Sequence, residues 1–158
     1  MKKKFLLVLI ALSFFANAKE KAPVSITTHS YQKVVTTSKS GKKIIKWQSV
    51  KKAVPGDIIK YVNSVKNSSP SEIKNVVVRN KINPNLIYIP KSAKAQSKAT
   101  IKFSVDGGKT FKLAKNLYVV KNGKKRVATY KDYNAIEWSI DSVGSKKTVN
   151  VEFKAKIK

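Results

Sequence analysis

Apolar and polar residues alternate along most of the chain after residue 19. The last segment shows this most clearly, because one side carries Val149, Val151, Phe153, Ala155 and Ile157 and the residues between them are polar or charged. Successive side chains of a strand point to opposite faces of a sheet, so the pattern predicts a half-buried β-strand. Segments 101–105 and 136–140 repeat the alternation and predict two further strands.

Turn-forming residues separate the predicted strands at regular intervals. Asp106-Gly107-Gly108 and Asn122-Gly123 both favour tight hairpin turns, because glycine readily adopts a positive φ. Eight to ten short strands joined in this way predict an all-β fold with antiparallel pairing, either a sandwich or a barrel. Helical periodicity is weak. Its best candidate is segment 91–98, which fits an exposed loop equally well.

The first eighteen residues have the three parts of a secretory signal peptide. Lysines follow Met1, an apolar run covers residues 5–15, and Ala16 and Ala18 supply the small residues that signal peptidase requires. The apolar run is much shorter than the roughly 20 residues that span a bilayer. We therefore expect a signal peptide over residues 1–18, cleaved after Ala18. The mature protein would be periplasmic, or secreted to the medium or the cell surface.

Residues 19–158 are long enough for one globular unit that buries about two thirds of its unfolded surface. The chain contains no cysteine, so this unit must be stable without disulfides. We expect residues 19–52 to form an N-terminal β extension, in which segments 24–36 and 44–50 pair as a hairpin. Residues 53–158 form the predicted sandwich domain. No stretch after the leader is long and apolar enough to cross a membrane as a helix.

Several motifs in residues 54–158 resemble one bacterial family. They include Pro55-Gly56-Asp57, Asn67, Asn75-Val76-Val77-Val78, Tyr88-Ile89-Pro90, segment 103–108, segment 136–138 and segment 149–153. In this order they are similar to the bacterial conserved repeat domain, the domain of unknown function numbered eleven. The resemblance implies an immunoglobulin-like antiparallel β-sandwich in an exported or surface protein. It implies no reaction and no catalytic residues.

The chain departs from that family at three positions. Asn63 stands where the family strand usually has an apolar residue, which predicts either a buried amide with hydrogen-bond partners or a bulge. Asn80 replaces a common acid and therefore weakens any charged-ligand role for that position. Glu137 replaces a residue that is often basic. The family is also commonly neutral or acidic, so the strong positive charge belongs to this chain.

The positive charge is extreme. The chain has 34 basic and 8 acidic residues and a formal net charge of +26, which falls to +23 if the three leader lysines are removed. Such a field attracts polyanions. Only Arg79 and Arg126 are arginines, however, and specific phosphate or base recognition favours the planar guanidinium. Lysines can equally keep a sheet face solvated and protect sheet edges, so both interpretations remain open.

The densest run of basic residues is a candidate anion-binding surface. It consists of Lys91, Lys94, Lys98, Lys102, Lys109, Lys112 and Lys115. Its anionic partners would be lipopolysaccharide, an acidic glycan or extracellular DNA, and the affinity would fall steeply with salt. Trp47 is the aromatic residue that alternation explains least, because it can lie exposed among lysines.

Residues for catalysis are sparse. His29 is the only histidine, and no G-x-S-x-G elbow, phosphate loop or dinucleotide motif is present. The acidic residues are scattered without the spacing of a metal site or of paired glycosidase carboxylates. We therefore expect no enzyme activity, no metal and no cofactor. A pocket that grouped His29 with an aspartate and a serine would revive a hydrolase.

Three functions follow in descending order. The first is an exported, non-enzymatic envelope or surface protein that serves in structure, adhesion or assembly, with an unknown protein or envelope polymer as partner. Its exposed sheet edges could recruit a partner strand. The second is an electrostatic binder of anionic polymers. The third and most remote is a secreted hydrolase with an unrecognised site. The oligomeric state is not predicted.

Overall fold

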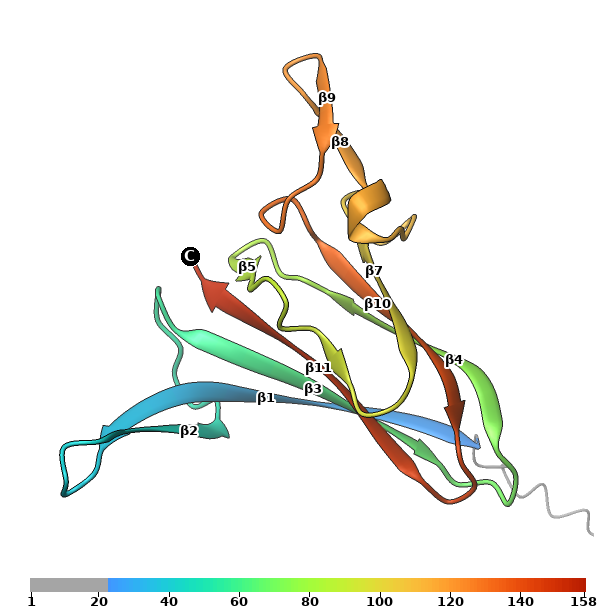
Figure 1. Cartoon of the computed structure of the whole chain (residues 1–158), viewed down its shortest axis with the longest axis horizontal. Helices are drawn as coiled ribbons and strands as arrows, with labels where there is room; N and C mark the ends of the chain where they lie inside the picture. Colours follow the sequence, from blue (N-terminus) through green and yellow to red (C-terminus); the bar gives the residue numbers. More distant parts are fainter. Residues whose placement is uncertain (1–22) are drawn as a thin grey trace, which may run out of the picture.

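The computed structural model describes residues 23–158. The predicted signal peptide, with Ala16 and Ala18, lies outside the described residues. Within them the chain forms eleven β-strands and one short 3-10 helix, which confirms the predicted all-β class (Figure 1). Over the same residues, no helix has the length and apolar character needed to cross a membrane.

The larger sheet, sheet A, is antiparallel throughout. Its strands run in the order β2 (Lys43–Ser49), β1 (Val24–Thr37), β3 (Ile58–Asn67), β11 (Thr148–Ile157) and β5 (Leu86–Tyr88), and β6 (Lys94–Ala95) also pairs with β11. The predicted hairpin of segments 24–36 and 44–50 is confirmed by the pairing of β1 with β2. The first half of β1 also pairs with β3, so the N-terminal extension and the sandwich share one sheet.

The smaller sheet, sheet B, packs against sheet A. It contains β4 (Ile73–Lys81), β10 (Ala135–Val143) and β7 (Ala99–Ser104). The remaining strands, β8 (Tyr118–Lys121) and β9 (Lys124–Val127), form a separate hairpin that follows the 3-10 helix η1 (Ala114–Asn116) and projects from the body (Figure 1).

The core lies between the two sheets, where the alternation placed it. Ile136, Trp138 and Ile140 of β10 are fully buried, and Val151 and Phe153 of β11 face them from sheet A. Aromatic rings continue this core, since Phe153 stacks on Tyr61 with ring centroids 5.0 Å apart. Burial of these large side chains is the main stabilising contribution in a fold without disulfides.

A pair of amides links the two sheets through the core. Asn63 of β3 is buried, accepts a 2.8 Å hydrogen bond from Thr28 Oγ1 and donates a 2.8 Å bond to Asn80 Oδ1 of β4. Two of the three departures from the family pattern are therefore partners of each other. The predicted alternative of a buried amide with hydrogen-bond partners is correct at Asn63, because satisfied pairing offsets the cost of burying its polar atoms.

Segment 91–98, the best candidate for a helix, contains no helix. Its residues Lys94 and Ala95 pair with Glu152 and Val151 and add a short strand to sheet A. The hydrogen bond from Gln96 N to Asn150 O continues this edge. Alanine-rich composition favours helix only weakly, and pairing with the exposed edge of β11 outweighs it here.

The turn after β7 is held by one carboxylate. Asp106 accepts hydrogen bonds from Thr110 Oγ1 at 2.6 Å, from Ser104 Oγ at 2.7 Å and from the backbone N–H groups of Lys109 and Thr110. The bonds from Thr110 are the largest of the effects that hold the pKa of the Asp106 carboxyl well below its usual range. Asp106 is thus a turn residue, as the sequence predicted, and Gly107 and Gly108 both have positive φ.

Candidate functional site

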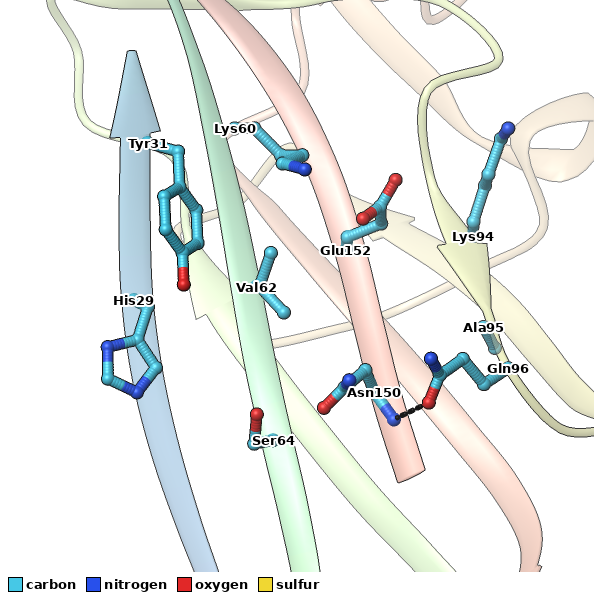
Figure 2. A pocket seen from close by; sticks show the side chains of 10 residues that line it. All are labelled: His29, Tyr31, Lys60, Val62, Ser64, Lys94, Ala95, Gln96, Asn150 and Glu152. Carbon is cyan, nitrogen blue, oxygen red and sulfur yellow. Dashed lines mark hydrogen bonds between the residues drawn. The ribbon is translucent and has the colours of Figure 1, made fainter. Parts of the chain in front are cut away.

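The outer face of sheet A carries a hollow. It is a concavity of about 490 Å³ whose lining comes from four strands and the residue after β6: His29, Tyr31, Lys60, Val62, Ser64, Lys94, Ala95, Gln96, Asn150 and Glu152 (Figure 2). We call this surface the sheet A hollow. On β1, β3 and β11 these side chains point away from the core, because they alternate with the inward positions of the same strands, whereas Ala95 packs against the core.

The register of sheet A sets the order of side chains across the hollow. His29 lies opposite Val62, Val62 opposite Glu152, and Glu152 opposite Lys94, so these four residues form one row across four strands. Side chains directly opposite one another in an antiparallel pair share a face, with Cβ atoms about 5 Å apart. The row therefore places one carboxylate between a histidine and a lysine.

A second row combines lysines with aromatic rings. Tyr31 lies opposite Lys60, and Lys60 lies opposite Lys154. The Lys60 ammonium stands 4.8 Å from the centre of the Trp47 ring and 5.5 Å from that of Tyr31, and Lys154 approaches the Trp47 ring to 5.3 Å. Trp47, which the sequence left unexplained, thus serves as a platform that holds two ammonium groups by cation–π contact.

The far end of the hollow is lined by amides and a hydroxyl. The backbone N–H of Asn150 donates a 2.9 Å hydrogen bond to Gln96 Oε1, while the Asn150 side chain is directed across the sheet toward Ser64 (Figure 2). Asn150 Oδ1 is shielded from solvent and has no hydrogen-bond donor within reach among residues 23–158. A buried acceptor without a partner is unfavourable.

The charge of the hollow is not neutralised from within. No ion pair within 4.0 Å joins Glu152, Lys60, Lys94 or Lys154 to an opposite charge in the described part of the chain. Two lysines and one carboxylate, Lys60, Lys94 and Glu152, therefore line a partly exposed surface, and Lys154 lies beside Lys60. Such a surface favours a ligand that carries both anionic groups and hydrogen-bonding groups.

The seven lysines of the predicted anion-binding run do not form one surface. Lys94 lines the sheet A hollow, while Lys102 of sheet B lies 3.6 Å from Glu137 and Lys98 lies 3.2 Å from Asp141. Lys91 borders a second hollow, Lys109 lies in the turn after β7, and Lys112 and Lys115 lie between that turn and β8. The run divides because β6 joins sheet A and β7 joins sheet B.

Sequence reasoning missed Lys60, Lys154 and Trp47 as site residues. The period-two pattern of β11 could have identified Lys154 as an outward residue, but in β3 the pattern is broken, because Ile58 and Val62 share the outward face of Lys60 and Asn63 points inward. The convergence of both lysines on Trp47 depends on the register of β2 on β1 and of β1 and β11 on β3, which the predicted hairpin alone does not specify.

The sheet A hollow brings His29 together with Ser64 and with a glutamate, Glu152, in place of the aspartate expected for a hydrolase. No hydrogen bond is recorded between any two of the three, and His29 instead lies near Tyr31, with ring centroids 6.5 Å apart. A triad needs its base within hydrogen-bond reach of the nucleophile. Among residues 23–158 there is also no cluster of three metal-ligating side chains.

A second hollow of about 400 Å³ opens near β5 and β7. Its walls are largely apolar and include Tyr88, Phe103, Tyr130 and Tyr133. Phe103 and Tyr133 stack with ring centroids 4.3 Å apart, and burial raises the pKa of the Tyr133 hydroxyl. Ala93 N donates to the Tyr88 hydroxyl at 3.2 Å, so part of this wall is engaged within the fold.

Comparisons of this chain with family models, with curated proteins and with solved structures gave no match. The resemblance to the conserved repeat domain therefore stays a prediction that rests on the motifs of residues 54–158.

Proposed function

We propose that the protein is an exported, non-enzymatic binding module that holds an acidic polysaccharide in the sheet A hollow. One observation carries the proposal: Lys60 and Lys94 line this hollow, Lys154 lies beside Lys60 over the Trp47 ring, and none of the three has an ion-pair partner in the described chain. Unpaired cations on a concave surface raise the local concentration of an anionic ligand.

The other side chains of the hollow favour a glycan over a nucleic acid. Gln96, Asn150 and Glu152 offer amide and carboxylate groups that form hydrogen bonds with sugar hydroxyls. Both arginines lie elsewhere, Arg79 on sheet B and Arg126 on the β8–β9 hairpin. A carboxylated sugar chain meets lysines with its acid groups and amides with its hydroxyls, which matches the whole lining.

The predicted export agrees with such a partner, because acidic polysaccharides belong to bacterial envelopes and their surroundings. In this account the assembly role first predicted for the protein takes the form of attachment to an envelope polymer. Attachment requires binding and no reaction, so His29, Ser64 and Glu152 serve as polar contacts to the polymer.

The test is calorimetric titration of the chain from Lys19 onward, which contains every described strand, with a galacturonate oligosaccharide. We expect binding that weakens as salt rises, and no binding of a neutral dextran oligosaccharide. The double variant Lys60→Gln/Lys154→Gln should bind about tenfold more weakly, since each exposed charge contact contributes up to about 1 kcal/mol.

A matched control has the same change of charge. Lys81 and Lys147 are exposed and lie outside the hollow, so Lys81→Gln/Lys147→Gln should bind within about twofold of the parent chain. Equal losses in both double variants would show that only net charge matters and would reject the site. Tighter binding of single-stranded DNA than of the galacturonate, or cleavage of the oligosaccharide that His29→Gln abolishes, would reject the proposed function.

A further inference from the structure

The β8–β9 hairpin stands apart from both sheets and from the sheet A hollow. Its four paired positions run from Tyr118 opposite Val127 to Lys121 opposite Lys124, and Asn122 and Gly123 form the turn with positive φ. The hairpin projects beyond the end of the sandwich (Figure 1). A hairpin of two strands is marginally stable alone, so its base must be fixed to the body.

That base is fixed by a buried leucine and an ion pair. Leu117 lies in the core at the start of β8, and Val119 packs against the core from the same end. Arg126 binds Asp132 with two hydrogen bonds of 2.7 and 2.8 Å, which raises the pKa of Arg126 and holds that of Asp132 well below its usual range. One face of the hairpin is thereby turned to the body.

The opposite face exposes apolar side chains to solvent. Tyr118, Val127 and Val120 share this face, because they lie at opposite or alternate positions of the two strands. Val120 is 73% exposed, the highest value among the exposed large hydrophobic side chains of the described residues, and Val127 is 48% exposed. Clustered apolar side chains at the end of a projecting element mark an interaction surface more strongly than scattered ones do.

The same hairpin is strongly basic. Lys121 and Lys124 lie directly opposite one another, and Lys125 stands 4.8 Å from the centre of the Tyr118 ring. Like charges in opposite positions destabilise a strand pair. The chain has no acidic residue between Asp106 and Asp132, so these three lysines have no acid nearby in sequence. An external anionic surface would relieve their repulsion.

We propose that the β8–β9 hairpin docks the protein onto an anionic lipid bilayer. Val120, Val127 and Tyr118 enter the boundary between headgroups and acyl chains, and Lys125 of the same face contacts the lipid phosphates. Lys121 and Lys124, which flank the turn on the other face, reach the phosphates from the tip of the hairpin. Aliphatic side chains gain little from a polar polymer but are stabilised in an acyl environment, and lysines beside them are attracted by anionic lipids. Charge complementarity together with exposed aliphatic residues selects the bilayer as the occupant.

The experiment is sedimentation of the chain from Lys19 onward with vesicles. We expect binding to equimolar phosphatidylglycerol and phosphatidylcholine, and little binding to phosphatidylcholine alone. Val120→Ser should weaken the binding about tenfold, because the most exposed apolar side chain is lost. Lys121→Gln/Lys124→Gln should weaken it about 25-fold, at about fivefold for each lysine.

Controls separate this surface from others. Val35→Ser changes a side chain that is 52% exposed on the other hairpin and should leave vesicle binding within twofold. A tryptophan in the variant Val120→Trp should shift its emission to shorter wavelength on anionic vesicles, and one in Val35→Trp should not. Equal losses in both serine variants, absence of the shift, or association only with another protein would overturn the proposal.

Failure of this docking and failure of the glycan proposal are distinguishable. Lys60→Gln/Lys154→Gln should keep vesicle binding within about threefold, and Val120→Ser should keep galacturonate binding unchanged. If Lys60→Gln/Lys154→Gln lost vesicle binding as fully as Lys121→Gln/Lys124→Gln, the hairpin would not be the docking element and the lipid proposal would fall.

Discussion

The outer faces of the two sheets both carry positively charged side chains, but these are paired with a carboxylate on sheet B and not on sheet A. On sheet B, Arg79 and Lys102 lie 2.7 and 3.6 Å from the buried carboxylate of Glu137. On sheet A, Lys60 and Lys154 lie over the Trp47 ring, and no carboxylate of the described chain pairs with them. The first arrangement neutralises charge within the fold, and the second leaves it available.

This difference explains why counting lysines does not identify a site. Glu137 is nearly buried, and Arg79 reaches across it to lie 4.9 Å from the Phe111 ring centre, so the cations of sheet B serve stability. Glu152 is the corresponding carboxylate of sheet A, and it lies unpaired in an open hollow. The two faces should therefore respond differently to the same kind of substitution.

The largest effect should come from the amide link beneath both faces. Asn63→Ala removes the hydrogen bonds to Thr28 and Asn80 and leaves the half-buried Asn80 without this partner. The free energy of unfolding should fall by about 3 kcal/mol in urea denaturation. In Asn63→Ala/Asn80→Ala the losses should be less than additive, because the two residues share one bond. A loss below about 0.5 kcal/mol would mean that this link does not join the sheets.

A matched pair of carboxylate substitutions tests the contrast directly. Glu137→Gln keeps the shape but removes the charge that two cations share, so the free energy of unfolding should fall by about 1.5 kcal/mol. Glu152→Gln should change it by less than about 0.5 kcal/mol, since Glu152 holds no ion pair with described residues. Similar losses in both variants, measured by urea denaturation, would remove the distinction between the faces.

Substitution of Trp47, which forms the aromatic platform, should have a smaller effect, and this effect is on the affinity for the glycan. Trp47→Ala frees the Lys60 and Lys154 ammonium groups, so the affinity for galacturonate should fall about threefold from lost pre-organisation. Trp47→Phe retains a ring and should recover part of that loss. If calorimetry found unchanged affinity in Trp47→Ala, the ring would have no role in positioning the lysines.

The smallest effect is a pH dependence of stability that comes from two carboxylates. Asp106 lies in the turn after β7, and Asp132 lies at the base of the β8–β9 hairpin. Asp106 and Asp132 have pKa values held below the ordinary range by hydrogen bonds in the folded state. Their contribution to stability is therefore complete above the unfolded pKa and is lost as pH falls through the acidic range, from about pH 5 downward. Asp132→Asn should flatten the fall of unfolding free energy on acidification, as followed by urea titration at several pH values. A steeper fall in this variant would contradict the sign.

Local patterns predicted the framework because strand alternation reports burial directly. The inward positions of β10 and β11, including Trp138 and Phe153, follow from period-two spacing alone. The hairpin turn at Asn122-Gly123 follows from backbone preferences of those residues. These features depend on residues that are close in sequence, so one sequence is sufficient to predict them.

The site could not be predicted because it depends on which strands pair. Lys94 and Lys102 are eight positions apart, yet they lie on the outer faces of different sheets. Lys60 and Lys154 are distant in sequence but lie opposite one another in the β3–β11 pair. The run of seven lysines is therefore divided between the two sheets, whereas register brings together the residues of the hollow.

The most direct test of the glycan site is an NMR titration of the chain from Lys19 onward with the galacturonate oligosaccharide. The predicted result is a set of amide shift changes confined to the sheet A hollow, with the largest at Lys60, Glu152 and Gln96 and none at Glu137 or Lys102. Changes centred on sheet B, or spread evenly over exposed lysines, would contradict the account.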